Sequence, residues 1–379
     1  MTEIKVLGGL DQISPEQWDA CAGAHNPTIS HAFLSAMEDS GSVGQQAGWV
    51  PRHLAVFDGA GDLAAAAPLY LKSHSYGEYV FDWGWADAFE RAGGRYYPKL
   101  QCSVPFTPVS GPRLLLRPDA EPQYADALVG GLIQVCEQLD VSSLHVTFPT
   151  ETEWQRFGDQ GFLQRTGEQF HWFNDGYASF DDFLSQLSSR KRKNIRKERE
   201  KVAEYGFEFK ALNGDDLNDQ AWDAFYDFYC NTSDKKWGQA YLNREFFTLL
   251  SEKMADRIVL IMVYDGDRIV AGALNILGSD ALFGRNWGCS EDYRFLHFEC
   301  CYYQAIDYAI AHGLKRVEAG AQGPHKLQRG YLPVRTYSAH WIRDPGLRNA
   351  VENYLKSERL HIDDEIEILN EHSPFRKQN

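Results

Sequence analysis

The string VEAGAQGPHKLQRGY, residues 317–331, gathers within a short span residue types that could do chemistry. Glu318 is expected to end a strand, and a turn of small residues that contains Gln322 follows it. His325, Lys326 and Arg329 come next at helical spacing. Small residues let a ligand approach the backbone, and loops held by a scaffold commonly carry function. The pattern indicates Glu318 as a base or amine anchor and the other four as binding groups for an anionic substrate. The alternative is a tight strand-to-helix connection with surface charges.

A second candidate is FLHFECC, residues 295–301, which places His297 and Glu299 before or within the first turn of a helix. Either side chain could take part in proton transfer. A glutamate at this position also suits the helix dipole and could simply cap the helix. Cys300 and Cys301 lie among aromatic residues with no clear base beside them, so buried packing is their expected role.

Two further stretches carry cations beside aromatic rings. SDKKWGQAYL places Lys235, Lys236 and Trp237 after a helix rich in aromatic residues, which suits phosphate binding with ring stacking, or else a surface loop. Arg285, in FGRNWG, is expected inside a strand, where a charge needs a partner. A substrate contact and a structural ion pair are both consistent with its position.

One helix concentrates positive charge, since eight of the twelve residues from Arg190 to Lys201 are basic. A single helix over 180–205 is predicted, with Ser179 and Asp182 forming a capping box and Gly206 ending it. Its buried stripe comprises Phe180, Phe183, Leu184, Leu187, Ile195 and Val202. The cations then occupy two outward flanks. A solvated face and a binding surface for phosphate or another polyanion both fit this pattern.

The whole chain is acidic by contrast, with 379 residues and a formal net charge of -15. This charge argues against broad nucleic-acid coating, so DNA is not an expected partner. The N-terminus lacks the pattern of a signal peptide, and no apolar run is long enough to span a membrane. The seven scattered cysteines show no spacing typical of a zinc site, and no metal is expected. Free thiols indicate a cytoplasmic protein.

The length predicts two domains, and two segments resemble each other. Residues 53–87 and 258–292 both read as strand, acidic glycine turn, small-residue strand, aromatic strand and then Trp-Gly, which pairs Trp83 with Trp287. A helix and a strand follow in each half, and Gly313 is expected to end the second helix. The first half also has a Pro-rich insert, either a cleft loop or a packed connector. We therefore predict a mixed α/β (α+β) architecture repeated twice, with domains 1–165 and 166–379. Because Phe81 stands opposite Arg285, a charged site is expected in the second half.

Three long strings resemble one bacterial family: QFHWFNDGYASFDDFLSQLSSRKRKNIRKEREK, DKKWGQAYL and RFLHFECCYYQAIDYAIAHGLKRVEAGAQGPHKLQRGYLPV. It is the predicted N-acyltransferase family labelled peptidoglycan biosynthesis or recognition, which is related to the Fem-type aminoacyl transferases. The resemblance covers nearly the whole chain. It implies two tandem acetyltransferase-like (GNAT) domains, with Lys193 and Arg196 in the best-matching places of a basic pattern on the helix entering the second domain.

The resemblance implies two possible acyl donors. Fem-type relatives move an amino acid from aminoacyl-tRNA to an amine of a peptidoglycan precursor, but the helical-hairpin insertion that many of them carry is missing here. GNAT enzymes use acyl-CoA and a Gly-rich pyrophosphate loop, of which RAGGRYYP, residues 91–98, is a loose echo. The donor, acyl-CoA or aminoacyl-tRNA, is therefore open from the sequence.

Three functions follow as hypotheses. The first is an N-acyltransferase or aminoacyltransferase that acts on an amine of a small-molecule or glycan-peptide acceptor, either cell-wall-like or bearing phosphate. The second is a tandem GNAT module that binds such a ligand without chemistry, because fold alone does not prove activity. The third is an RNA-associated protein that uses the basic helix, with tRNA as its partner.

Overall fold

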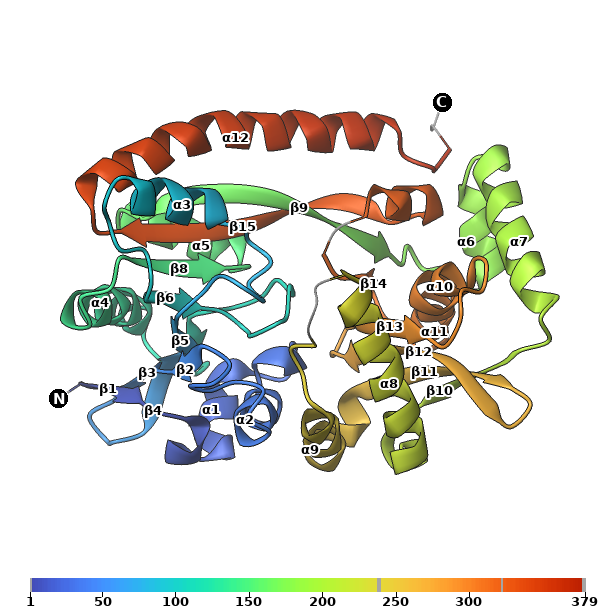
Figure 1. The fold of residues 1–379 in the computed structure, drawn as a ribbon, viewed down its shortest axis with the longest axis horizontal. Helices are drawn as coiled ribbons and strands as arrows, with labels where there is room; N and C mark the ends of the chain where they lie inside the picture. Colours follow the sequence, from blue (N-terminus) through green and yellow to red (C-terminus); the bar gives the residue numbers. More distant parts are fainter. Residues whose placement is uncertain (1, 237–239, 322, 377–379) are drawn as a thin grey trace. The chain divides into compact units, whose positions relative to one another are not determined.

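The computed structural model describes residues 2–236, 240–321 and 323–376. The chain forms two compact units (Figure 1). The N-terminal unit comprises Met1–Glu168 and Arg335–Glu365, and the C-terminal unit comprises Gln169–Val334 and Ile366–Asn379. The chain passes from one unit to the other within β9 (Leu163–Phe173), within β15 (Leu332–Ile342) and within α12 (Pro345–Glu371).

The N-terminal unit contains two groups of strands. One has the order β1-β3-β4-β7: β1 (Glu3–Leu7), β3 (His53–Phe57), β4 (Leu63–Ala67) and β7 (Leu115–Leu116). The other has the order β15-β8-β6-β5-β2, with β8 (Ser143–Thr147), β6 (Lys99–Cys102), β5 (Leu69–Lys72) and β2 (Trp49–Pro51). The chain changes from the first group to the second at Pro68, which has no backbone N–H to give to a ladder.

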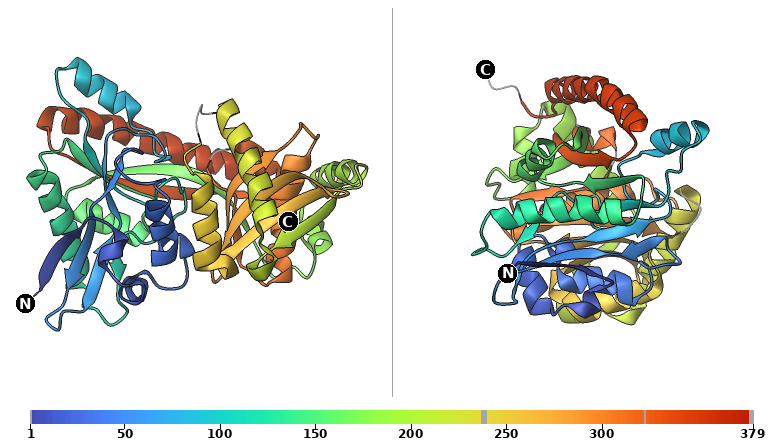
Figure 2. Two further views of the ribbon diagram at one scale, coloured as in Figure 1. Left: turned by 60° about the horizontal axis from the view of Figure 1, so that its bottom comes forward. Right: turned by 90° about the vertical axis from the view of Figure 1, so that its left-hand side faces the viewer.

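Helices cover these strands. They are α1 (Pro15–Ala22), α2 (His31–Asp39), α3 (Trp83–Arg91), α4 (Gln123–Gln138) and α5 (Glu151–Asp159), together with α12. Helix α4 lies along the strands of this unit (Figure 2), because its apolar stripe, which includes Leu128 and Leu132, joins Leu54, Leu100 and Leu144 in one core cluster.

The C-terminal unit has the strand order β10-β11-β12-β13-β14-β9. The new strands are β10 (Glu208–Leu212), β11 (Ile258–Asp265), β12 (Arg268–Leu277), β13 (Ala281–Cys289) and β14 (Arg316–Glu318). Its helices are α6 (Phe180–Gln186), α7 (Ser189–Ala203), α8 (Asp219–Lys236), α9 (Arg244–Met254), α10 (Leu296–Phe298) and α11 (Gln304–Ala311). A π-helical turn, Glu299–Tyr303, joins α10 to α11. Strand β11 is buried along Ile258–Val263, as expected for a strand covered on both faces.

The two units repeat one strand pattern, as predicted. In the N-terminal unit β5 pairs antiparallel with β6, β6 parallel with β8 and β8 antiparallel with β15. In the C-terminal unit β12, β13, β14 and β9 show the same sequence of pairings. Helices α4 and α11 precede the corresponding strands β8 and β14, and Gly313, with φ 65°, ends α11 as predicted.

The third strand of the first repeat was assigned wrongly. The aromatic stretch before Trp83 forms no strand, and Trp83 begins helix α3, whereas Trp287 lies in β13. The true third strand is β6, inside the Pro-rich insert, which is thus a packed connector. The side chains of Tyr76, Phe81 and Trp83 are exposed while Glu78 and Asp82 are buried. This segment therefore turns its carboxylates inward and its rings outward, which is the reverse of an amphipathic strand.

The single basic helix predicted over 180–205 is two helices, α6 and α7, with a break at Leu187 and Ser188. Ser179 does cap α6, because its hydroxyl accepts from the Asp182 N–H at 3.1 Å. At the break, the Ser188 N–H donates to the Pro374 carbonyl at 2.9 Å, and Leu187 bridges to Phe375. Backbone pairing with the C-terminal segment has thus replaced helical hydrogen bonds, which local helix propensity does not reveal.

Candidate active site

The parallel pairing of strands β13 and β14 ends beside Glu318. Their pairing ends at Phe283 opposite Glu318, although β13 continues to Cys289. The chain leaves β14 through Gly320, whose φ is +72°. A Cβ atom on Gly284 would stand 3.2 Å from the Glu318 carbonyl oxygen. The two backbones therefore approach closely where their pairing ends, which places Glu318 at the carboxyl end of β14.

Glu318 is a buried carboxylate with one oxygen held and one oxygen free to accept. Its Oε1 receives the Arg316 Nε–H at 3.0 Å, and Arg316 also binds Asp280 at 3.0 Å. Its Oε2 has no hydrogen-bond partner among the described residues and lies 3.8 Å from His171 Nε2. Burial lowers the pKa of His171, so this imidazole is neutral at pH 7. The free oxygen can accept a proton or bind an ammonium group.

Lys326 lies close by on a 3₁₀ turn, Pro324–Arg329, and its side chain is almost fully buried. Its Nζ donates to the Gly320 carbonyl at 2.9 Å. Burial lowers the pKa of Lys326 to about 8, because no carboxylate among the described residues pairs with it. An ammonium has three donors, so two remain for another acceptor. A desolvated cation of this kind favours an oxyanion or another negative group.

Aromatic side chains surround this turn. His325 Nε2 lies 2.9 Å from the Tyr302 hydroxyl, and the ring of His325 packs against Phe298. His297 is only partly buried and stands edge-on to Tyr302, with ring centroids 5.4 Å apart. Two imidazoles and a phenol thus gather around the turn that carries Lys326, and they could bind or exchange protons there.

Arg329 and Glu299 belong to the attachment of helix α7. Arg329 donates to both oxygens of Glu198 at 2.8 and 3.0 Å, and its guanidinium lies 3.4 Å from the centre of the Phe298 ring. Glu299 accepts from Arg199 at 2.9 Å, and burial raises its pKa. One residue pair of the basic helix, Glu198 and Arg199, thus turns inward and is held by these two residues.

The outer face of α7 exposes four of the eight cations of this helix: Arg190, Lys193, Arg196 and Lys197. Lys193 is exposed and forms no ion pair with a described residue, while Arg196 pairs with Asp181 at 2.8 Å at the surface. Arg285 lies in β13 beyond the end of the parallel pairing, partly buried. Lys235 and Lys236 end helix α8. Trp237 and Gln322 lie outside the described residues.

Sequence reasoning missed a cluster of buried charges in the N-terminal unit. Lys99 donates to Glu78 Oε2 at 2.7 Å and to Asp82 Oδ2 at 2.5 Å, and its side chain is fully buried. Lys72 lies 3.6 Å from Glu78 and stacks on Trp49 at 3.4 Å. Two cations meet two anions, so the cluster is balanced internally. Strand β6, which pairs parallel with β8, supplies Lys99. The carboxylates of Glu78 and Asp82 already balance this cation, so no charge is left for a ligand to balance.

Comparisons with known proteins give a family and a fold. The family described as peptidoglycan biosynthesis/recognition (FemAB-like) matches residues 9–377. No curated protein matches the chain. Within the described residues, no helix is long and apolar enough to cross a membrane.

Three solved structures share the fold at low sequence identity. The crystal structure of FemX has TM-score 0.57 at 11% identity, and the match covers 90% of this chain and 98% of that chain. The C-terminal domain of a putative lysylphosphatidylglycerol synthetase from Agrobacterium fabrum has TM-score 0.54 at 8% identity, covering 89% and 95%. L-PGS from Bacillus licheniformis has TM-score 0.51 at 10% identity, covering 85% and 95%. The predicted mixed α/β fold, with one strand pattern repeated in two units, is confirmed.

Proposed function

The chain belongs to the FemAB-like family of peptidoglycan biosynthesis and recognition, and from this premise we propose that its C-terminal unit catalyses transfer of an acyl or aminoacyl group to an amine. The acceptor is the amine of a peptidoglycan precursor or of a similar phosphate-bearing molecule. One observation supports the proposal: Glu318, with an unpartnered oxygen, ends β14, and the desolvated Lys326 on the following turn donates to the Gly320 carbonyl.

The chemistry requires only these two groups and the acyl donor. The amine nitrogen attacks the acyl carbonyl carbon, so a C–N bond forms and the carbonyl oxygen becomes an oxyanion. The free oxygen of Glu318 takes the proton that the nitrogen loses. The Lys326 ammonium offers its two spare donors to the oxyanion. When the C–O or C–S bond to the carrier breaks, Glu318 returns its proton to the leaving oxygen or sulfur.

Burial suits both residues to these roles. A cation in a low-dielectric site attracts an oxyanion more strongly than it would in water. The neutral His171 beside Glu318 leaves the negative charge of the carboxylate uncompensated on that side. A substrate ammonium would supply the missing positive charge on binding, and it releases its first proton to solvent so that the neutral amine attacks.

The test is product formation with defined donors. The purified chain is incubated with a UDP-linked muramyl pentapeptide and, separately, with tRNA charged with labelled amino acids or with labelled acetyl-CoA. Mass spectrometry then follows the acceptor. A mass increment equal to one acyl group supports the proposal. Saturable acceptor binding with no product from any donor would instead favour a binding module.

The donor is decided by a salt series of tRNA binding. If aminoacyl-tRNA is the donor, we expect the exposed cations of α7 to contact its phosphates. Changing Lys193, Arg196 and Lys197 together to alanine should then make the log–log salt slope shallower by about 0.7 to 0.9 for each phosphate that is no longer neutralised. Replacing Lys5 and Lys210, which are exposed elsewhere, is the control. A slope that the triple variant leaves unchanged would exclude this helix from tRNA binding.

A further inference from the structure

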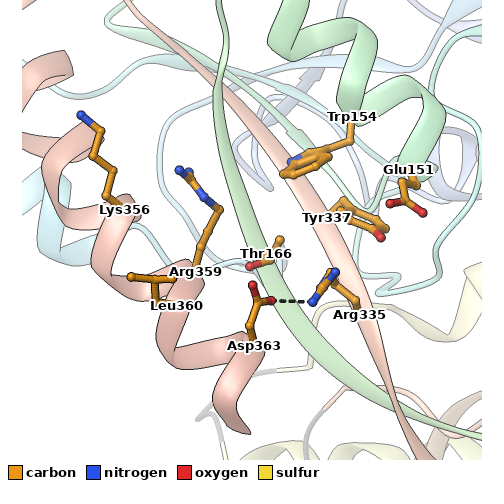
Figure 3. A pocket seen from close by; sticks show the side chains of 9 residues that line it. All are labelled: Glu151, Trp154, Thr166, Arg335, Tyr337, Lys356, Arg359, Leu360 and Asp363. Carbon is orange, nitrogen blue, oxygen red and sulfur yellow. Dashed lines mark hydrogen bonds and ion pairs between the residues drawn. The ribbon is translucent and has the colours of Figure 1, made fainter. Parts of the chain in front are cut away.

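The N-terminal unit contains a pocket, and none of the residues that line it takes part in the proposed acyl transfer. It is lined by side chains from helices α5 and α12 and from strands β9 and β15, whose ribbons run between the two helices (Figure 3), and its volume is about 340 Å³. This volume is at the lower end of the range for small-molecule sites. Its lining residues are Glu151, Trp154, Thr166, Arg335, Tyr337, Lys356, Arg359, Leu360 and Asp363.

One side of the pocket is aromatic. The rings of Trp154 and Tyr337 lie side by side, with centroids 5.0 Å apart and an interplanar angle of 44°. The Trp154 indole N–H donates to the Ser338 carbonyl at 3.0 Å, so the ring is held in place by the backbone of β15. The fixed indole offers a flat face on which a planar ring can stack at little entropic cost.

The uncommitted charge in the pocket is positive. Both acids already have partners. Asp363 pairs with Arg335 at 2.6 Å. Glu151 interacts with Tyr337: burial raises the pKa of the Tyr337 hydroxyl, and the Glu151 carboxylate raises it further. Arg359 has one partner among the described residues, the Gln164 carbonyl, which leaves most of its five donors free. Lys356 forms only an exposed pair with Glu352, a contact of little strength.

The floor of the pocket holds a buried polar atom without a partner. The Thr166 hydroxyl makes no hydrogen bond with any described residue, although the side chain is almost fully buried. A buried hydroxyl without a partner costs about 1–3 kcal/mol. A ligand with a donor or acceptor at its edge would satisfy this group. The aromatic wall, the free cations and the unpartnered hydroxyl therefore point to one kind of ligand.

We propose that this pocket binds a nucleoside monophosphate. Its base stacks against Trp154, the edge of the base meets the Thr166 hydroxyl, and its phosphate binds Arg359. Phosphate is favoured over a carboxylate because its dianion and several oxygens match the planar fork of the guanidinium. The proposal does not depend on acyl transfer in the C-terminal unit.

Calorimetric titration of the full chain with AMP tests this site. AMP should bind with a Kd of about 1 mM or lower, and adenosine and inorganic phosphate should each bind at least about ten-fold more weakly. Arg359→Met should weaken AMP binding by about ten-fold or more. Arg91→Met, at an exposed arginine of the same unit, should leave it unchanged. Absence of AMP binding by the folded wild type, or equal weakening in both variants, would overturn the proposal.

Thr166→Val provides a variant that keeps the shape of the pocket. Removing the unpartnered hydroxyl should raise the free energy of unfolding while it weakens AMP binding several-fold, two effects of opposite sign. Unchanged AMP affinity in this stable variant would contradict the placement of the base. If inorganic phosphate bound as tightly as AMP, the site would be an anion site alone and the nucleotide proposal would be wrong.

Discussion

The Lys326 ammonium donates to the Gly320 carbonyl oxygen at 2.9 Å, in a place where no carboxylate of the described residues balances its charge. Two other buried cations of the chain are paired with carboxylates: Arg329 with Glu198, and Lys99 with Glu78 and Asp82. An unbalanced buried charge is unfavourable for folding. Its presence in this turn is therefore best explained by a negative group that arrives with the substrate.

Lys326→Met should stabilise the protein while it abolishes function. The folded-state pKa of about 8 lies below the ordinary value of 10.5, so the ammonium is less stable in the folded chain than in the unfolded chain at pH 7. By linkage, this penalty is at most about 3 kcal/mol, and it disappears as the pH rises from about 8 to about 10.5. Urea unfolding of the two proteins at pH 7 measures the gain. A variant less stable than wild type would show that Lys326 holds the turn together.

Arg329 should behave in the opposite way. Its guanidinium is almost fully buried and binds both oxygens of Glu198, so Arg329→Met leaves a carboxylate poorly compensated. We expect a decrease of about 3 kcal/mol in the free energy of unfolding. Lys193→Met, on the exposed face of the same helix, should change it by less than about 0.5 kcal/mol. Similar stabilities for both variants would contradict the assignment of Arg329 to the attachment of α7.

The charge cluster of the N-terminal unit makes Lys99 a structural residue. Burial alone would raise the pKa of Asp82, but Lys99 outweighs it and holds that pKa well below its usual range. Lys99→Met leaves Glu78 and Asp82 facing each other without water, and should cost about 3–5 kcal/mol. Lys5→Met, at an exposed lysine of the same unit, is the matched control. Thermal unfolding that does not distinguish the two variants would mean that the cluster contributes nothing to stability.

Mild acid should weaken the fold through its buried histidines. Burial lowers the pKa of His145 to about 3 and also lowers those of His171 and His340. Between pH 6.5 and these lower values the unfolded chain binds protons that the folded chain does not, so stability falls as pH falls. The urea midpoint should therefore be lower at pH 5.5 than at pH 7.5. An unchanged midpoint would show that these imidazoles are protonated in the folded state.

The fold was largely predictable because strand and helix patterns are local. The β11–β12 hairpin, the apolar stripe of α11 and its end at Gly313 all follow from residue spacing. The residues around Glu318 were also found, since a charged strand end followed by small residues is visible in the sequence. The sequence did not reveal which of these charged side chains are already paired, because the partner of Arg329 is Glu198, which lies far from it along the chain.

The structure also differs from the sequence reading where distant segments meet. The break between α6 and α7 depends on Pro374 and Phe375. The sequence placed everything after residue 165 in one domain, whereas Arg335–Glu365 lies with the N-terminal unit. The buried charge cluster of the first half was missed because Glu78 and Asp82 stand in an aromatic stretch. Only the pairing of β5 with β6 brings Lys72 and Lys99 together beside these two acids.

The most direct test of the acyl-transfer proposal is the single-turnover rate of amide formation in Glu318→Gln, compared with Glu208→Gln at an exposed strand position. The amide keeps the size and the contact with Arg316 but cannot take a proton from the attacking amine. A fall of about 10²- to 10⁴-fold in Glu318→Gln, with Glu208→Gln at the wild-type rate, is the predicted result. Amide formation at the wild-type rate in Glu318→Gln would contradict the assignment of Glu318 as the base.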